Sequence, residues 1–173
     1  HLPALLEDLG IYHRIALYGL VVMGLLIHFL FHRCNNEAKR YALLYISMAT
    51  MIAFCFKYDF SNFTAPVSWP LHLCNTAMFI VPLVLIFKWD KLFYFTLFIN
   101  VLGALLAMLM PNTDGANWLS DTSVDFWINH YMAFLLPILI ISLRIFPRAK
   151  LKQFIYSLVA FFGYYVLVLV LNA

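Results

Sequence analysis

Residues 11–31 read IYHRIALYGLVVMGLLIHFLF, an almost uninterrupted apolar run in which Arg14 is the only strongly charged side chain. A helix needs about 20 mostly apolar residues to cross the hydrocarbon core of a bilayer. The run meets this length, so it predicts a transmembrane helix. It therefore indicates an integral membrane protein.

Five further apolar runs follow, each bounded by polar breaks. They cover residues 41–56, 70–87, 92–110, 126–146 and 153–171, and the second is short for a full span. The breaks between them leave no room for a soluble domain. We predict an all-α, polytopic membrane bundle of about six transmembrane helices, forming one transmembrane domain over residues 1–173.

The composition supports this class. Hydrophobic residues make up 65% of the chain and charged residues only 11%, whereas soluble domains are about 45–50% apolar and about 25% charged. The net charge of +3 is scattered over short loops, which excludes a nucleic-acid partner and leaves membrane lipid as the expected one. The chain starts at His1 without a basic segment, so we expect no signal peptide and a domain that is incomplete at both ends.

The basic residues predict the orientation. Nine of the 11 lie in the first, third and fifth breaks or at the adjoining helix ends: Arg33, Lys39, Arg40, Lys88, Lys91, Arg144, Arg148, Lys150 and Lys152. Only Arg14 and Lys57 fall on the other side. Lys and Arg are retained in cytoplasmic loops. We therefore expect loops 32–40, 88–91 and 147–152 to be cytoplasmic and both ends of the chain to be non-cytoplasmic.

Three histidines recur near the outer ends of the spans that run inward. His13, His72 and His130 have nearly equal spacing, which suggests three tandem helical hairpins. Ionisable groups inside spans usually face a bundle interior or a wet cavity, so the three rings indicate a shared polar pocket. The simpler alternative is that each ring is hydrated in the headgroup region.

The segment WPLHLCNT at 69–76 is the richest in polar chemistry. Pro70 suits the first turn of a helix, and His72, Asn75 and Thr76 fall on one helical face. Cys74 lies about 200° around that helix from His72. A catalytic partner for Cys74 must therefore come from another helix, and His130 or His13 can supply it.

The residues from Pro70 to Asn75, the stretch GALLAMLMP at 103–111 and the pair Asn129 and His130 together resemble the YwaF-like family of bacterial membrane proteins. Its animal relative is transmembrane protein 164. The resemblance covers nearly the whole chain and implies an acyltransferase acting on lysophospholipids, including ether lipids. It implies a cysteine nucleophile at Cys74 and family histidines at His13 and His130. It also implies a further polar stretch and span after Ala173.

This chemistry assigns roles to six residues. Acyl transfer needs a nucleophile, a base and donors for the oxyanion. We predict Cys74 as nucleophile and His130 as base, with His72 and His13 as further catalytic candidates. Asn75 and Asn129 are the candidates for substrate binding. No cofactor is expected. The chain lacks the Cys and His spacing of a metal site, although three converging histidines remain an alternative metal site.

Other interpretations of Cys74 stay open. Cysteine is often a small buried hydrophobe with no chemical role. Cys55 and Cys74 flank the same predicted loop, so they form a disulfide if their Cα atoms approach within about 7 Å. The alternative to an enzyme is a non-catalytic subunit that packs against a larger membrane complex or binds lipid.

Overall fold

The computed structural model describes residues 10–57, 73–110 and 120–171. These residues form helices joined by short turns, with no strand among them. The elements are α2 (Ile11–Phe31), α3 (Asn36–Lys57), α4 (Leu73–Phe87), α5 (Asp90–Phe95), the π-helix η1 (Thr96–Asn100), α6 (Val101–Leu109), α7 (Asp121–Ser142) and α8 (Leu151–Leu171). Because α5, η1 and α6 follow one another without a break, the described residues make six rods. The predicted all-α bundle is confirmed.

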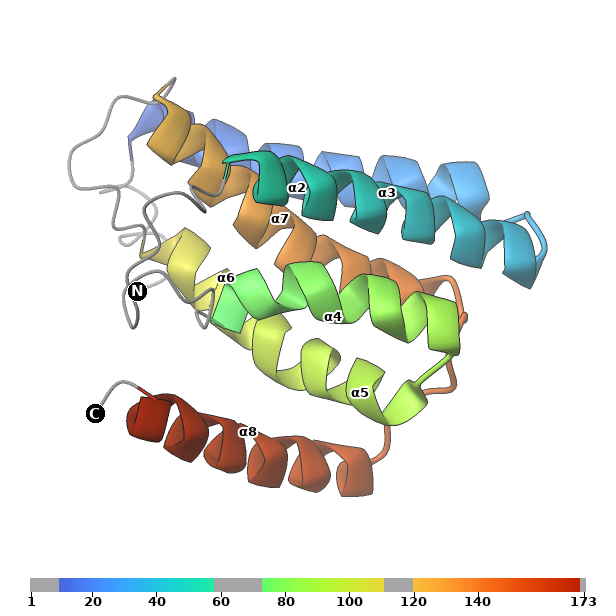
Figure 1. Ribbon diagram of the computed structural model, residues 1–173. Helices are drawn as coiled ribbons and strands as arrows, with labels where there is room; N and C mark the ends of the chain where they lie inside the picture. Colours follow the sequence, from blue (N-terminus) through green and yellow to red (C-terminus); the bar gives the residue numbers. More distant parts are fainter. Residues whose placement is uncertain (1–9, 58–72, 111–119, 172–173) are drawn as a thin grey trace.

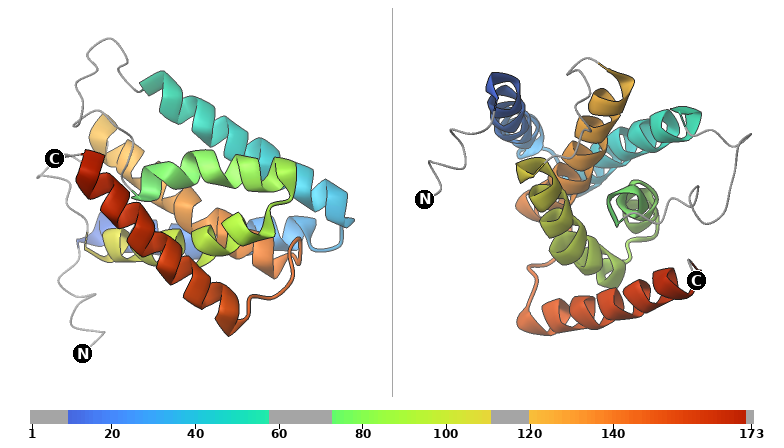
Figure 2. Two further views of the ribbon diagram at one scale, coloured as in Figure 1. Left: turned by 60° about the horizontal axis from the view of Figure 1, so that its bottom comes forward. Right: turned by 90° about the vertical axis from the view of Figure 1, so that its left-hand side faces the viewer.

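Helix α7 runs through the middle of the bundle. It contacts α2, α3, α4 and α6, whereas α8 packs against α5 and η1 at the edge. The right-hand view of Figure 2 shows α7 between α2 and α3, and α7 also packs against α4 and α6. Rods that follow one another along the chain alternate in direction, so α2, α4 and α7 all begin at the same end of the bundle (Figure 1).

Of the three predicted hairpins, the middle one is a packed pair, because α4 contacts α5, η1 and α6, whereas the first and the last exist as chain path only. Helices α2 and α3 each make more contacts with α7 than with each other, and α8 packs on α5 rather than on α7, which precedes it. The reason is that α7 lies between α2 and α3, and that α8 packs against α5. Any repeat in the sequence therefore does not translate into three similar packed pairs.

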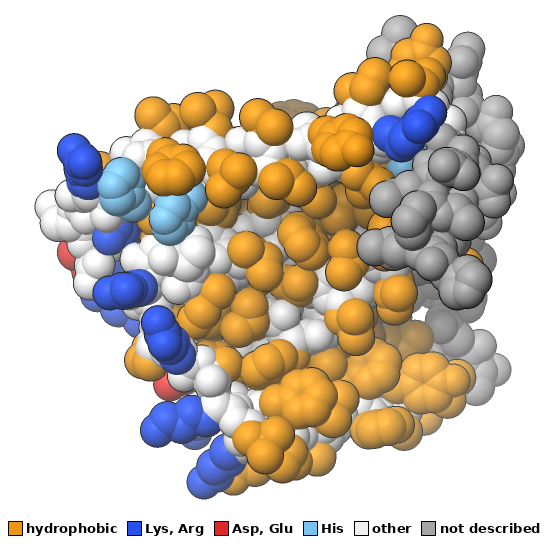
Figure 3. Space-filling model, turned by 180° about the vertical axis from the view of Figure 1, so that it is seen from behind, with side chains coloured by type: hydrophobic (Ala, Val, Ile, Leu, Met, Phe, Trp, Pro, Cys, Tyr) orange, Lys and Arg blue, Asp and Glu red, His pale blue; other side chains and the backbone are white. Residues whose placement is uncertain are grey.

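Four helical stretches are long and apolar enough to cross a membrane: Ile11–Phe31, Asp90–Leu109, Ser123–Ser142 and Leu151–Leu171. The shorter α4 is also apolar. Large hydrophobic side chains cover the outer faces of α2 and α8, and Figure 3 shows this coat over the side of the molecule. Such a surface is stable only in lipid, so these helices imply a membrane environment.

The helix at the second predicted span is longer than predicted, and it is not among the four stretches that are apolar enough to cross a membrane. Helix α3 has 22 residues and begins at Asn36 instead of residue 41. Asn35 caps it, because the Asn35 side-chain oxygen accepts a hydrogen bond of 2.8 Å from the Ala38 N–H. Asn satisfies a first-turn donor in this way at many helix starts. The polar residues between 36 and 40 thus belong to the helix, and the first loop shrinks to residues 32–35.

The fifth span is displaced from its predicted range of 126–146. Helix α7 begins at Asp121, where the Ser120 side chain accepts from the Ser123 N–H, and it ends at Ser142. The residues at this start are acidic or carry hydroxyl groups, so the hydropathy pattern places the beginning of the span too late. The polar cap and the acidic first turn suit a helix N-terminus.

Helices α4 and α7 end in the same way, each with a basic residue in the left-handed region. Lys88 has φ of 56° and Arg144 has φ of 60°. The Trp89 N–H bonds to the Val84 carbonyl at 3.3 Å, and the Ile145 N–H bonds to the Ile140 carbonyl at 3.0 Å. This six-to-one pattern is a Schellman termination, which glycine usually marks. Because no glycine marks the end of α7, its end could not be predicted from the sequence. The last loop is 143–150 rather than 147–152.

The packing differs between the two ends of the bundle. Toward the end where α7 begins, a small buried cluster consists of Ala77, Ala104 and Ala133 with Met78, and the larger Met108 and Trp127 are buried beside it. At the other end the buried residues are large and include Leu85, Phe93, Leu136, Ile140, Leu143 and Phe146. The Phe93 and Phe146 rings stack with centroids 4.9 Å apart.

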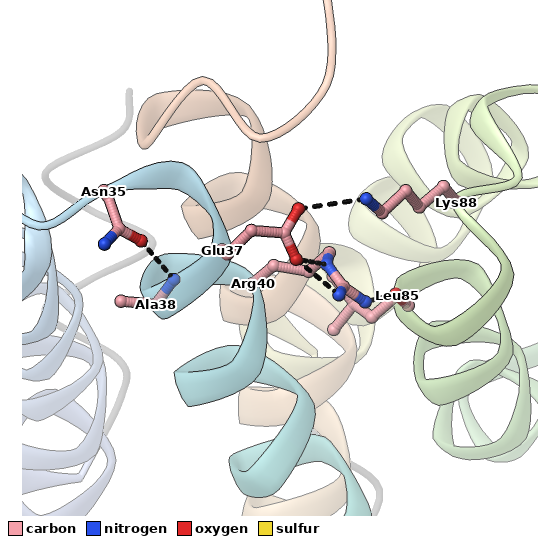
Figure 4. Close-up of polar contacts among 6 residues, drawn as sticks. All are labelled: Asn35, Glu37, Ala38, Arg40, Leu85 and Lys88. Carbon is pink, nitrogen blue, oxygen red and sulfur yellow. Dashed lines mark hydrogen bonds and ion pairs between the residues drawn. The ribbon is translucent and has the colours of Figure 1, made fainter.

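The end where α7 finishes is also joined by charged groups (Figure 4). Arg40, only 8% exposed, donates to Glu37 at 2.6 Å and to the Leu85 carbonyl at 2.7 Å. Lys88 adds a second ion pair to Glu37 at 2.9 Å. These bonds tie the start of α3 to the end of α4. Figure 3 shows Lys and Arg side chains gathered along this end of the molecule.

Candidate functional site

Two asparagines join α4 to α7 at the end where both helices begin. The Asn129 Nδ2 donates a hydrogen bond of 3.2 Å to the Asn75 Oδ1. Amide hydrogen bonds of this kind hold helices together where lipid offers no alternative partner. The bond puts Asn75 and Asn129 at the same level and on facing sides of the two helices. Both predicted substrate-binding residues therefore lie in one place.

Helical geometry then positions the neighbours of these asparagines. Cys74 lies about 100° back from Asn75, and His130 about 100° forward from Asn129. Because α4 and α7 run in the same direction (Figure 1), these two rotations lead to the same side of the α4–α7 contact. We call the contact between α4 and α7 around Asn75 and Asn129 the amide seam. Cys74 and His130 therefore project to one flank of the amide seam.

The ring of His130 is held by its own helix. Its Nδ1 lies 2.6 Å from the Phe126 carbonyl oxygen. A carbonyl can only accept, so Nδ1 carries the proton and Nε2 keeps its lone pair. The Phe126 ring also covers the imidazole, with centroids 4.2 Å apart. This tautomer suits a general base that receives a proton at Nε2.

Cys74 is half-buried and packs against the cluster of small residues that includes Ala104 of α6 and Ala133 of α7. Cys34, Cys55 and Cys74 all carry free thiols, so the alternative disulfide between Cys55 and Cys74 is not formed. Within the described residues, no hydrogen bond joins the Cys74 thiol to a histidine ring. Cys74 and His130 share a flank of the amide seam without a hydrogen bond between them.

His13 takes a different position. Its ring is buried and meets Trp127 edge-on, with centroids 5.2 Å apart, and it hydrogen bonds to the Met108 backbone. Trp127 lies about 200° around α7 from Asn129. His13 thus packs on the α2 side of α7, away from the amide seam. Nearby, the Tyr131 hydroxyl donates to the Ala16 carbonyl of α2. His72 lies outside the described residues.

Asn100 is a functional candidate that the sequence analysis missed. It ends the π-helical segment Thr96–Asn100 and is fully buried. Its Nδ2 donates a 2.6 Å hydrogen bond to the carbonyl of Leu73, the residue before Cys74. Its Oδ1 is buried without a hydrogen-bond partner. A lone amide inside the apolar run 92–110 was the available signal, because an intramembrane polar side chain marks function by default.

The π-helical turn explains how Asn100 reaches this position. A π-turn inserts an extra residue into a helix and often occurs at functional sites. Here it lies where the rod passes α4, α7 and α8. Thr76 also donates to the Leu73 carbonyl, at 2.7 Å. The peptide next to Cys74 is therefore fixed by side chains from two elements.

The converging groups around the amide seam are amides, one thiol and one imidazole. Among the residues with described positions, no three His, Cys, Asp or Glu side chains come together closely enough to hold a metal ion. The arrangement can bind a neutral polar group through the amides and offer a thiol beside it. These are the elements of acyl-group chemistry.

Comparison with known proteins gives one match. The model of the TMEM164 family matches residues 9–173. No curated protein and no solved structure matches the chain. The match confirms the resemblance to animal transmembrane protein 164 drawn from the segments around Cys74 and His130. The chain, which forms a membrane bundle of six rods with an amide seam beside Cys74, belongs to the TMEM164 family.

Proposed function

We propose that this chain modifies a membrane lipid by acyl transfer or hydrolysis, with Cys74 as nucleophile and His130 as base. The observation that carries the proposal is the Asn75–Asn129 hydrogen bond, because it brings together the two helices on which Cys74 and His130 share a flank. The tautomer of His130 adds support, since its Nε2 has a free lone pair. The substrate is a phospholipid or lysophospholipid that enters from the surrounding bilayer.

In the first step the Cys74 sulfur attacks the ester carbonyl carbon of the lipid, and its proton passes to His130 Nε2. The bond from the carbonyl carbon to the lysolipid oxygen then breaks, and His130 returns the proton to that oxygen. This leaves a thioester on Cys74. A lysolipid hydroxyl or water attacks the thioester carbon and gives its proton to His130. The bond from that carbon to sulfur then breaks, His130 passes the proton to the Cys74 sulfur, and the acylated lipid or the fatty acid is released.

The amides fit the role of binding the oxyanion. Asn129 uses one Nδ2 hydrogen on Asn75 and keeps a second, and the Asn75 amide has two more. Such donors stabilise the negative oxygen of a tetrahedral intermediate. Asn100 is a positioning residue, because it acts through the Leu73 carbonyl rather than on the lipid. The separation of Cys74 and His130 is compatible with catalysis, since such contacts often tighten only when substrate binds.

The test uses a protein with Cys74 as its only cysteine, made by Cys34→Ser and Cys55→Ser. Membranes holding it are incubated with a phospholipid that carries a radiolabelled acyl chain. We expect label on the protein that neutral hydroxylamine removes, because hydroxylamine cleaves thioesters. His130→Gln should slow labelling about 100-fold by removing the base, while Cys74→Ser should abolish the hydroxylamine-sensitive label.

Cys55 provides the matched control, because it is also a half-buried free thiol. A protein with Cys55 as its only cysteine should remain unlabelled. Equal labelling of the two single-cysteine proteins, or full labelling after His130→Gln, would refute the enzymatic proposal.

The second candidate is a non-catalytic membrane subunit. The observation that favours it is the lack of a hydrogen bond between Cys74 and an imidazole in the described part of the chain. As such a subunit, the protein would use the broad apolar exteriors of α2 and α8 to pack against membrane-protein partners. Absence of any thioester in wild-type membranes, together with a stable complex of larger mass after extraction, would favour this function.

We further propose that the end with the ion pairs faces the cytoplasm. The gathering of Lys and Arg there (Figure 3) supports this orientation, because basic residues are retained on the cytoplasmic side. Loops 32–40, 88–91 and 147–152, as first delimited, would then be cytoplasmic and both ends of the chain non-cytoplasmic. Cys34 is exposed at this end. In a protein that keeps Cys34 as its only cysteine, a membrane-impermeant maleimide should therefore label cells only after permeabilisation, and labelling of intact cells would reverse the orientation.

A further inference from the structure

Two hollows meet at Ser142, at the end of the bundle opposite to Cys74. The first is an apolar crevice of about 400 Å³ between α2 and α7. The second is a polar hollow of about 690 Å³ formed by the turn after α7. Ser142 lines both. One molecule with an apolar and a polar part can therefore occupy them together.

The crevice is shaped by a close approach of the two helices. A side chain at Gly24 of α2 would meet the Leu135 side chain of α7 at 3.0 Å, so Leu135 packs directly on the glycine. Val21 and Leu25 lie along the crevice on α2, and Ile138 lies along it on α7. Its lining is almost wholly apolar, which suits a hydrocarbon chain.

The junction between the hollows is a histidine–serine pair. His28 Nδ1 lies 3.1 Å from Ser142 Oγ. The Ser142 hydroxyl donates to the Leu139 carbonyl at 3.2 Å, so Ser142 accepts from His28. Polar groups thus begin where the apolar lining ends, as they do between the tails and the headgroup of a phospholipid.

The polar hollow carries positive charge. Arg144 and Arg148 line it with Ser142, and its lining includes no acidic residue. Arg144 occupies the left-handed position of the turn, with φ of 60°, and both arginine side chains are exposed. Arginine binds phosphate oxygens through paired, charge-assisted hydrogen bonds. Two arginines without a carboxylate favour a headgroup with net negative charge over a zwitterion.

We propose that the crevice and the hollow together bind one anionic phospholipid. Its phosphate contacts Arg144 and Arg148, and one acyl chain lies between α2 and α7 beside Gly24. This site is separate from the amide seam and does not depend on any reaction at Cys74. The bound lipid would be a structural ligand that holds α2 against α7, which is the main helix that α2 contacts.

The test is native mass spectrometry of the purified protein with phosphatidylglycerol or phosphatidylcholine of identical acyl chains. Wild type should bind phosphatidylglycerol about tenfold more tightly, because each arginine near an anionic headgroup adds a favourable increment. The double variant Arg144→Gln with Arg148→Gln should lose this preference. The double variant Lys150→Gln with Lys152→Gln removes the same amount of charge from residues that follow closely in the sequence but do not line the hollow. It should keep the preference for phosphatidylglycerol.

The acyl chain is tested by a matched pair on α2. Leu25→Trp should fill the crevice and weaken the binding of both lipids, whereas Leu26→Trp, at a similarly exposed position outside the crevice, should not. Glycerol phosphate alone should not compete at the same concentration. Equal loss in both charge variants, equal binding by the two tryptophan variants, or effective competition by glycerol phosphate would each overturn the proposal.

Discussion

The two ends of this bundle are held together by different chemistry. At the end where α7 begins, small residues such as Ala104 and Ala133 let the helices approach, and the cross-links are neutral amides. At the other end, large side chains such as Phe93 and Phe146 fill the core, and the bond from Arg40 to the Leu85 carbonyl and the Lys88–Glu37 ion pair join α3 to α4.

The contrast suggests a division of labour. Charged links need water or headgroups nearby to offset the cost of burying ions, and the loop end supplies them. Neutral amides leave donors and acceptors to spare within the membrane, as Asn100 does with its buried oxygen. The charged end therefore stabilises the fold, whereas the amide end keeps the free polar groups that the proposed function would use.

The largest effect on stability should come from Phe93→Ala. Phe93 is fully buried and stacks on Phe146, so the truncation leaves a cavity that costs about 3 kcal/mol. Thermal unfolding in detergent measures the loss. Phe162→Ala on the exposed face of α8 is the control and should change stability by less than about 0.5 kcal/mol. Similar losses in the two variants would mean that the aromatic core does not govern stability.

Arg40→Met should have the next largest effect. It keeps an unbranched apolar stem but removes the guanidinium, which leaves the Leu85 carbonyl without its charged donor and costs about 2 kcal/mol. The same unfolding assay applies, with Lys39→Met as the control because Lys39 is one residue away and less buried. A wild-type stability for Arg40→Met would show that the bond from Arg40 to the Leu85 carbonyl is not needed to join α3 to α4.

The Asn75–Asn129 bond should contribute less to stability, and it sharpens the comparison. A double-mutant cycle with Asn75→Leu and Asn129→Leu should give a coupling energy of about 0.6 kcal/mol, the average for hydrogen bonds between membrane helices. Either single variant should nevertheless slow the proposed labelling of Cys74 by a larger factor than this coupling predicts, because it disturbs the site. Labelling at the wild-type rate in both would separate the amide seam from the chemistry.

The smallest effect concerns pH. Hydrogen bonds from Arg40 and then Lys88 lower the pKa of Glu37 below its ordinary value of 4.5. The folded protein therefore holds this proton less tightly than the unfolded chain, so the stabilisation is present above that value and is lost as the pH falls through the lowered pKa. Glu37→Gln should flatten the acid limb of the stability profile. High salt should weaken the effect, since Glu37 is exposed, and an unchanged profile in the variant would contradict it.

Much of the fold could be predicted from the sequence because the membrane imposes a simple length rule on apolar runs. The first span at 11–31 coincides with α2, and the last, at 153–171, with most of α8. The errors occur where ends depend on local hydrogen bonds. Asn35 and Ser120 start helices within polar segments, and Arg144 ends one without glycine.

The candidate site was predictable only in part. Asn75 and Asn129 were expected together, and the structure joins them directly. His13 was expected in the same pocket but packs on Trp127 instead, because sequence position gives the depth of a residue along a helix but not the side of the bundle it faces. Asn100 escaped notice because the π-turn that directs it toward Leu73 leaves no mark in a hydropathy pattern.

The sequence by itself determined that this is a helical membrane protein, with its basic residues collected in alternate loops. It could do so because apolar length and charge are local properties of the chain. Only the tertiary structure decided that α7 is the central helix, that α8 packs on α5, and that Cys74 and His130 share one flank beside a pair of amides. These features depend on helix rotation and on which helix faces which, and lipid-facing and protein-facing positions are equally apolar in such a chain.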